Sequence, residues 1–183
     1  MALAAILDLI EGGSQTLSAD HFIPGHVTAS AFVVDRSRTR VLLIHHAKLG
    51  RWLQPGGHVD DGEDVLTAAI REFREETGVD GVMLSDGVFD VDVHPIPPSG
   101  KRPAHTHYDV RFLLQAVGED LVESDEVLGV GWVAFADVAA RTGDPSVLRA
   151  VAILAELPNG PAGARETRWR ENVESPSGYS KRA

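Results

Sequence analysis

Three glutamates stand close together in the stretch GGHVDDGEDVLTAAIREFREETGV, which spans residues 56–79. Glu75 and Glu76 follow Glu72 by three and four positions, so in a helix the three carboxylates lie on one face, within a few ångströms of each other. Like charges at this spacing repel, and the pKa of at least one member is therefore expected to rise. The cluster needs a cation to offset the repulsion.

A hard divalent cation would remove that repulsion. Mg²⁺ prefers carboxylate oxygens and usually shares its coordination shell with substrate phosphates. Metal ions about 3.5–4 Å apart can stabilise both sides of a displacement at phosphorus, and a remaining carboxylate can take a proton from the attacking water. The residues thus predict a metal-dependent phosphoryl or pyrophosphoryl hydrolysis site. The alternative is a solvated helix face with one ion pair, between Arg71 and Glu75 at i and i+4.

A helix that positions these acids is predicted over roughly residues 63–77. Apolar side chains recur there at helical spacing, at Val65, Leu66, Ala69, Ile70 and Phe73. This face is expected to pack into the core, while the opposite face carries the carboxylates. Gly78 is well placed as the C-terminal cap residue.

Strands are predicted on both sides of that helix from alternating or β-branched segments at residues 26–35, 40–47, 51–54, 82–94, 107–117 and 127–135. Further helices are predicted at the N-terminus, ending at Gly12 and Gly13, and at residues 136–141 and 144–157. Strand pairs joined by short turns, with helices at the ends, predict an α+β fold, an α/β/α sandwich with a mixed sheet. A doubly wound dinucleotide fold is not expected, because no G-x-G-x-x-G motif follows a strand.

Composition narrows the class of protein further. The chain has 183 residues, a formal net charge of −10 and no cysteine. The acidity argues against a nucleic-acid or anionic-membrane binder, and thiolate zinc sites and disulfides are excluded. No apolar run has the length of a bilayer span, and the N-terminus lacks a basic leader, so a cytoplasmic location is the default expectation. We expect a helix and linker at residues 1–25, one domain at 26–157 and a polar, flexible tail at 158–183.

The acidic stretch also carries a longer pattern, G-x5-E-x7-R-E-U-x-E-E-x-G-U, in which U is a bulky apolar residue. Its specified residues are Gly57, Glu63, Arg71, Glu72, Glu75, Glu76 and Gly78. The pattern resembles the Nudix box, and every specified residue matches. Phe73 is a mild departure from the more usual aliphatic residue and affects packing only. The resemblance extends over roughly residues 27–156, where the strand order also looks like the Nudix sandwich.

The resemblance implies a role for each matching residue. Glu72, Glu75 and Glu76 look like the carboxylates that hold Mg²⁺ or Mn²⁺, and the Gly57 carbonyl commonly joins them. Arg71 looks like the residue that orients a glutamate, with Glu75 as the expected partner. Glu63, by the same resemblance, supports loop geometry. Nudix enzymes hydrolyse a nucleoside diphosphate linked to another group, by attack of water at phosphorus.

The general base differs among members of that family. Here Glu126 is the candidate, because it lies in an acidic loop six residues before Trp132, where similar enzymes often supply a further acid. Glu123 and Asp125 in the same loop compete with it.

Candidate substrate-binding residues flank the box, at Arg51, Trp52, His105, His107, Tyr108 and Arg111. The aromatic pair is expected to stack on a base, and the cations to meet phosphate. His105 and His107 would share one strand face and form either a phosphate contact or a weak metal site. Zinc is not expected there without a third ligand.

The predicted function is a metal-dependent hydrolase acting on a small nucleotide, either an ADP-ribose-like molecule or a nucleoside triphosphate. The alternative is a catalytically silent Nudix-like module that senses nucleotides or binds a partner. Degenerate modules usually lose a metal carboxylate, and none is lost here, so the enzyme is favoured. A homodimer is left open, with the N-terminal helix or the C-terminal tail covering an edge.

Overall fold

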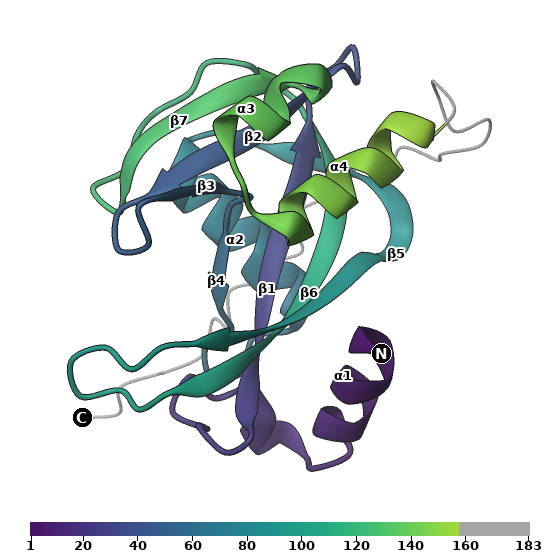
Figure 1. Cartoon of the computed structure of the whole chain (residues 1–183). Coiled ribbons are helices and arrows are strands. Elements are labelled where there is room, and N and C mark those ends of the chain that lie inside the picture. The colour runs from purple at the N-terminus through teal and green to yellow at the C-terminus, as the bar shows by residue number, and fades with distance from the viewer. Residues whose placement is uncertain (158–183) are drawn as a thin grey trace, which may run out of the picture.

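The computed structural model describes residues 1–157, so the tail predicted at residues 158–183 lies outside the described residues. The elements run in the order α1 (Ala2–Ile10), the 3-10 helix η1 (Ser14–Leu17), β1 (Gly25–Val34), β2 (Arg40–His46), β3 (Arg51–Leu53), β4 (Gly56–His58), α2 (Val65–Thr77), β5 (Gly81–Ile96), β6 (His105–Ala116), β7 (Val127–Ala134), the 3-10 helix η2 (Phe135–Asp137), α3 (Val138–Arg141) and α4 (Pro145–Glu156) (Figure 1). Within this part of the chain, none of the helices combines the length and apolarity needed to cross a bilayer.

A seven-stranded mixed sheet organises the molecule. Its main order is β3-β2-β1-β6-β5, with β4 also paired to β1 and β7 paired to β2. β1 and β6 run parallel over ten paired residues, whereas the other strand pairs are antiparallel. Every residue of β1 is buried, as expected for a strand covered on both faces.

Alternate residues of β1 divide the core into two layers. Ala29, Ala31 and Val33 pack against α2, in a cluster that includes the fully buried Phe73. Phe32 and Val34 face the other way and pack against α4. The two helices therefore cover opposite faces of β1 (Figure 1). The arrangement confirms the predicted α/β/α sandwich with a mixed sheet.

The helix that carries the acidic cluster has strong signals at both ends. Asp64 caps its N-terminus, because the carboxylate accepts hydrogen bonds from the N–H groups of Leu66 and Thr67. Gly78 ends it in the left-handed conformation, with φ of 70°. The predicted start at residue 63 was two residues early, because Glu63 is engaged in the preceding loop.

One strand escaped the sequence analysis. Residues 56–58 lie outside the predicted strands, yet they form β4, in which Gly57 pairs with Ala29 and His58 with Thr28. Glycine has low strand propensity, so only the partner strand reveals this element. The pairing matters because it fixes the Gly57 backbone beside α2.

Candidate active site

The three glutamates of α2 differ in their surroundings. Glu76 is buried, and its carboxylate accepts a hydrogen bond from the Gly56 N–H at 2.9 Å. The Glu72 carboxylate packs so closely on Gly57 that a Cβ at that position would overlap with it. Glu75 is the outermost of the three, with 60% of its side chain exposed. Two of the carboxylates thus lie against β4, and the third faces solvent.

Burial raises the pKa values of two of these glutamates, because a buried carboxylate is harder to ionise. Burial raises the pKa of Glu76 from 4.5 to about 8, although the Gly56 N–H opposes the change, and the nearby charges of Glu72, Glu126 and Glu75 raise it further. Burial also raises the pKa of Glu72, against the effect of Arg71. The prediction that at least one member of the cluster would show a raised pKa is confirmed, although the main cause is burial, and repulsion among the glutamates comes second to it.

Arg71 holds the cluster together from one side. Its guanidinium donates to both Glu63 oxygens at 2.9–3.3 Å and to the His58 carbonyl at 3.0 Å. It also donates to Glu72 at 3.0 Å and to Glu75 at 3.1 Å. The hydrogen bond to Arg71 is the main reason why the pKa of Glu63 is lowered. Arg71 therefore contacts Glu75, its expected partner, and it also joins α2 to β4 and to the loop between them. That it orients Glu75 stays a prediction.

Replacing Arg71 with lysine is expected to lower kcat by about 10- to 100-fold, because an ammonium cannot bridge these acceptors as a planar guanidinium does. Steady-state kinetics at saturating Mg²⁺ measure this effect. Arg74→Lys is the matched control, since Arg74 lies on the same helix but pairs with Asp80. Equal activity in both variants would mean that Arg71 does not position the carboxylates.

The pKa of Glu76 predicts how stability depends on pH. Between about pH 5 and pH 8 the folded metal-free protein keeps the Glu76 proton, whereas the unfolded chain has lost it. The folded state then binds more protons, so the free energy of unfolding falls as pH rises across this interval. A divalent ion favours the ionised carboxylate, so Mg²⁺ is expected to raise Tm more at pH 8 than at pH 6.

Thermal melts with a chelator and with Mg²⁺ across this pH range test the expectation. Glu76→Gln is the control, because glutamine can still accept from the Gly56 N–H but cannot ionise. The pH slope assigned to Glu76 should disappear in this variant. The same slope in Glu76→Gln and in the natural protein would show that Glu76 is not its source.

Glu126, the predicted base, lies in the turn immediately before β7. It is exposed, and its N–H donates to the Ser124 hydroxyl. Its negative charge is close enough to contribute to the raised pKa of both Glu72 and Glu76. Its place near the cluster keeps Glu126 as the candidate; its role as a base stays a prediction.

Two predicted substrate contacts are wrong because their side chains are buried in other interactions. Tyr108 packs in an apolar cluster with Ile6 and Leu9 of α1, so its ring is not free to stack on a base. Arg111 is 2% exposed and lies among Asp90, Asp92 and Asp109, at 2.8–3.5 Å. Asp109 precedes Arg111 by two residues on β6, whereas Asp90 and Asp92 come from β5 by strand pairing, which the local sequence does not reveal.

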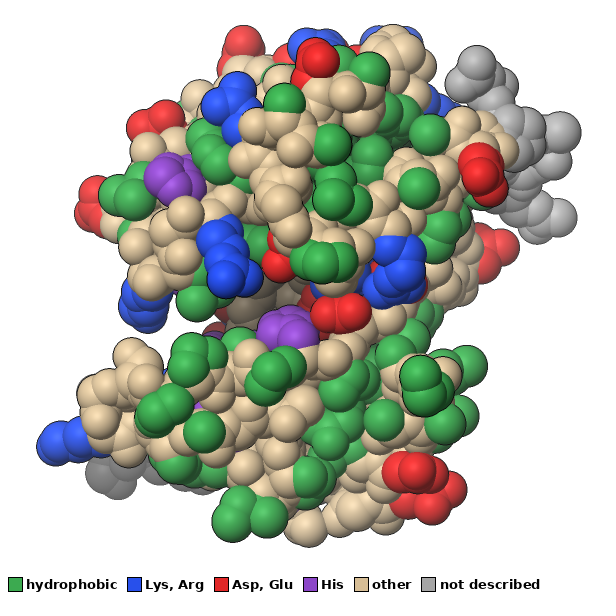
Figure 2. Space-filling model, in the orientation of Figure 1, with side chains coloured by type: hydrophobic (Ala, Val, Ile, Leu, Met, Phe, Trp, Pro, Cys, Tyr) green, Lys and Arg blue, Asp and Glu red, His purple; other side chains and the backbone are tan. Residues whose placement is uncertain are grey.

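Arg51 and Trp52 lie apart from that ion network, at a cavity of about 490 Å³ next to α3 and α4. The Trp52 ring stacks on His45 and has the Arg141 guanidinium at 4.7 Å from its centre. The residues that line this cavity do not include the glutamates of α2. Figure 2 shows a second hollow on this face, between the β5–β6 hairpin and the body above it, with acidic and histidine side chains at its edges.

His105 and His107 share a strand face, as predicted, and their Nε2 atoms lie 3.2 Å apart. The structure adds partners that the sequence analysis missed. His26 on β1 is directly opposite His107 in the parallel pairing, and His58 on β4 lies beside the same group. Only the strand register could have revealed them, because these residues are far apart along the chain.

Comparisons with known proteins agree with this fold. A model of the NUDIX domain matches residues 24–152. A probable DHNTP pyrophosphohydrolase of Lactococcus lactis subsp. cremoris is 33% identical over 115 residues, which cover 62% of this chain and 68% of that protein. An isopentenyl-diphosphate Delta-isomerase of Streptomyces coelicolor is 32% identical over 155 residues, or 76% of each protein. The matches to two further relatives cover only 25% and 35% of the length of those proteins.

Solved structures show the same architecture. A hydrolase of the NUDIX family from Clostridium perfringens has a TM-score of 0.60 at 21% identity, covering 73% of this chain and 98% of that one. A likeness at this identity supports the fold alone, whereas the domain match covers most of the sequence and includes the whole acidic stretch. The chain therefore belongs to the Nudix hydrolase family.

Proposed function

We propose that this protein is a divalent-metal-dependent pyrophosphohydrolase that cleaves a nucleoside diphosphate linked to another group. The observation that supports this most strongly is the placement of Glu72 and Glu76 against Gly57 and Gly56 of β4, with Glu75 beside them and Arg71 bonded to both Glu72 and Glu75. A solvated helix face would not bury Glu76 or raise its pKa to about 8.

The donor set fits Mg²⁺ or Mn²⁺. Carboxylate oxygens and a backbone carbonyl are the ligands that hard cations prefer, and the buried Glu76 carboxylate needs a neighbouring positive charge to ionise. Glu72, Glu75, Glu76 and the Gly57 carbonyl would hold the ion. The bound metal would supply positive charge to the phosphate oxygens and to the leaving group.

The remaining steps fall to side chains of this protein. Arg71 keeps the Glu72 and Glu75 carboxylates oriented. Glu126 accepts a proton from the water that attacks phosphorus, as the P–O bond of the anhydride breaks. Loss of activity in Glu126→Gln, with metal affinity retained, is the result expected of a base.

The substrate is a small nucleotide, in either an ADP-ribose-like or a nucleoside triphosphate form. Arg51, Trp52 and Arg141 support recognition of an aromatic anion, because they place two guanidinium groups and an indole at one cavity. The name of the Lactococcus protein supports the triphosphate option. We place the enzyme in the cytoplasm, where such nucleotides are made. Light scattering would distinguish a monomer from a homodimer.

A substrate panel tests the proposal. Nucleotide sugars, ADP-ribose, dinucleotides, nucleoside triphosphates and isopentenyl diphosphate are incubated with the protein and Mg²⁺, and phosphate is measured directly and after phosphatase treatment. Turnover of one anhydride class that a chelator abolishes is the expected result. Binding of nucleotides without turnover would instead support the sensing module, and conversion of isopentenyl diphosphate without phosphate release would support an isomerase.

A further inference from the structure

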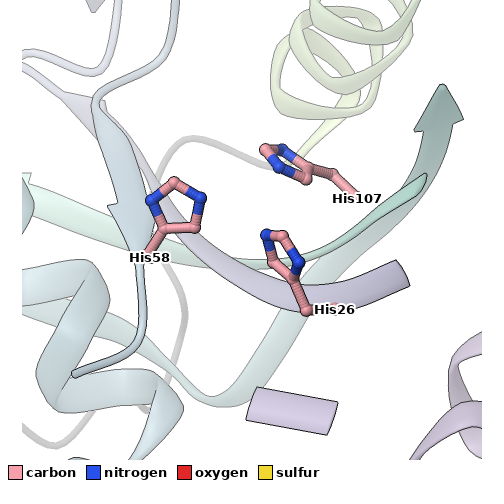
Figure 3. Close-up of side chains that lie close together, drawn as sticks. All are labelled: His26, His58 and His107. Carbon is pink, nitrogen blue, oxygen red and sulfur yellow. The ribbon is translucent and has the colours of Figure 1, made fainter. Parts of the chain in front are cut away.

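A cluster of histidines lies outside the carboxylate group. His26 of β1, His58 of β4 and His107 of β6 each offer one ring nitrogen, and these nitrogens all lie within 4.8 Å of one another. Figure 3 shows the three rings turned toward a common point between the strands. Three strands that are distant in sequence thus deliver three imidazoles to one place.

The hydrogen bonds of two rings leave ligand lone pairs inside the cluster. His26 Nδ1 is 3.1 Å from the His21 carbonyl, which can only accept, so Nδ1 carries the proton and Nε2 keeps its lone pair. That Nε2 atom is buried without a hydrogen-bond partner among the described residues, and so is Nε2 of His58. Leaving a buried polar atom unpaired costs about 1–3 kcal/mol, so two in one cluster call for a partner.

The same reasoning assigns a lone pair to His107. His105 Nδ1 is 2.8 Å from the Pro103 carbonyl and must donate to it, which leaves Nε2 of the neutral His105 ring as an acceptor. The contact of 3.2 Å between the two Nε2 atoms then requires that His107 Nε2–H donates, so His107 Nδ1 has the free lone pair. His26 and His107 each donate one N–H to a fixed acceptor and keep the other nitrogen free, which is the usual arrangement of metal-bound histidine.

We infer that His26, His58 and His107 form a second metal site, selective for Zn²⁺ or a similar transition ion, with a coordination position left open. Imidazole nitrogen suits Zn²⁺, whereas Mg²⁺ prefers the oxygen ligands of the glutamates. Zn–N bonds of about 2.0–2.1 Å need nitrogens about 3.3 Å apart in a tetrahedral site, so small side-chain rotations would close the present spacing. The bound ion would join β1, β4 and β6.

A cluster of rings in aromatic contact without a metal is the competing account. Ring centres lie 4.8 Å apart for His26 and His107, and 5.1 Å apart for His26 and His58, with the rings tilted against each other, which is normal aromatic contact. Aromatic contact explains these distances but leaves the two Nε2 atoms without partners. Metal binding accounts for both observations.

Zinc binding to tag-free, chelator-treated protein tests the inference, with excess Mg²⁺ present to fill the carboxylate site. Competition with a chromogenic chelator should show one Zn²⁺ per chain at micromolar or lower Kd. His107→Gln and His26→Gln should each weaken binding by about 100-fold or more. His94→Gln is the matched control, because His94 lies opposite His107 on β5 but bonds to Asp92; it should bind Zn²⁺ like the natural protein.

Two further measurements keep the outcome clear. Co²⁺ added to the natural protein should give the visible absorption of a tetrahedral nitrogen-ligated ion, even if a histidine variant fails to fold. Glu75→Gln should retain Zn²⁺ binding while losing turnover, which separates this site from the proposed active site. No Zn²⁺ binding at micromolar concentrations, or binding that survives in His107→Gln and disappears in Glu75→Gln, would overturn the inference.

Discussion

Glu75→Gln is expected to lower kcat by about a thousandfold, because it removes one of the proposed charged metal ligands from a site where electrostatic stabilisation carries much of the barrier reduction. The fold should be almost unaffected. The Glu75 side chain is 60% exposed and contacts Arg71, so the free energy of unfolding should change by no more than about 0.5 kcal/mol. Steady-state kinetics and urea unfolding on the same preparation measure the two effects.

Asp80→Asn is the control for loss of a negative charge near this helix. Asp80 is exposed, lies three residues beyond the end of α2 and pairs with Arg74. Its replacement should leave kcat unchanged. Full activity in Glu75→Gln at saturating Mg²⁺ would remove Glu75 from the metal site.

Arg111→Met is expected to destabilise the protein by about 3–5 kcal/mol, because it leaves Asp90, Asp92 and Asp109 buried without their shared cation. Urea unfolding measures the loss, which is a large part of the stability of a typical domain. A substrate-binding role predicts the opposite pattern, a normal unfolding free energy with a raised KM.

Arg149→Met is the matched control for this network. Arg149 also contacts Asp90 and Asp92, but its side chain is 44% exposed, so its ion pairs are screened by solvent. Its loss should cost about 1 kcal/mol or less. Equal destabilisation by the two variants would show that burial of Arg111 is not what makes its ion pairs important.

Local patterns in the sequence were enough to predict the helix and the acids it carries. Apolar spacing located α2, and the i, i+3 and i, i+4 positions of Glu72, Glu75 and Glu76 predicted a shared face with a raised pKa. The shared face depends on neighbours within one helix, so a single segment contains that information, whereas the size of the pKa change comes mainly from burial of Glu76 against β4, which is a tertiary contact.

Features made by strand pairing were not predictable in the same way. Arg111 looked like a free cation because its partners on β5 are brought to it by the sheet register. His26 and His58 were absent from the predicted sites because nothing local links them to His107. Tyr108 was predicted to contact the substrate. The sequence could not show that its ring packs against α1, because that packing is a tertiary contact.

An anomalous difference map from crystals soaked in Mn²⁺ would show whether Glu72, Glu76, Glu75 and the Gly57 carbonyl form a site for a hard divalent ion, as we propose. The expected result is a peak about 2.1 Å from oxygens of these residues, present in the natural protein and lost in Glu75→Gln/Glu76→Gln. A map with no peak at these residues, from crystals that turn over substrate with Mn²⁺, would contradict it.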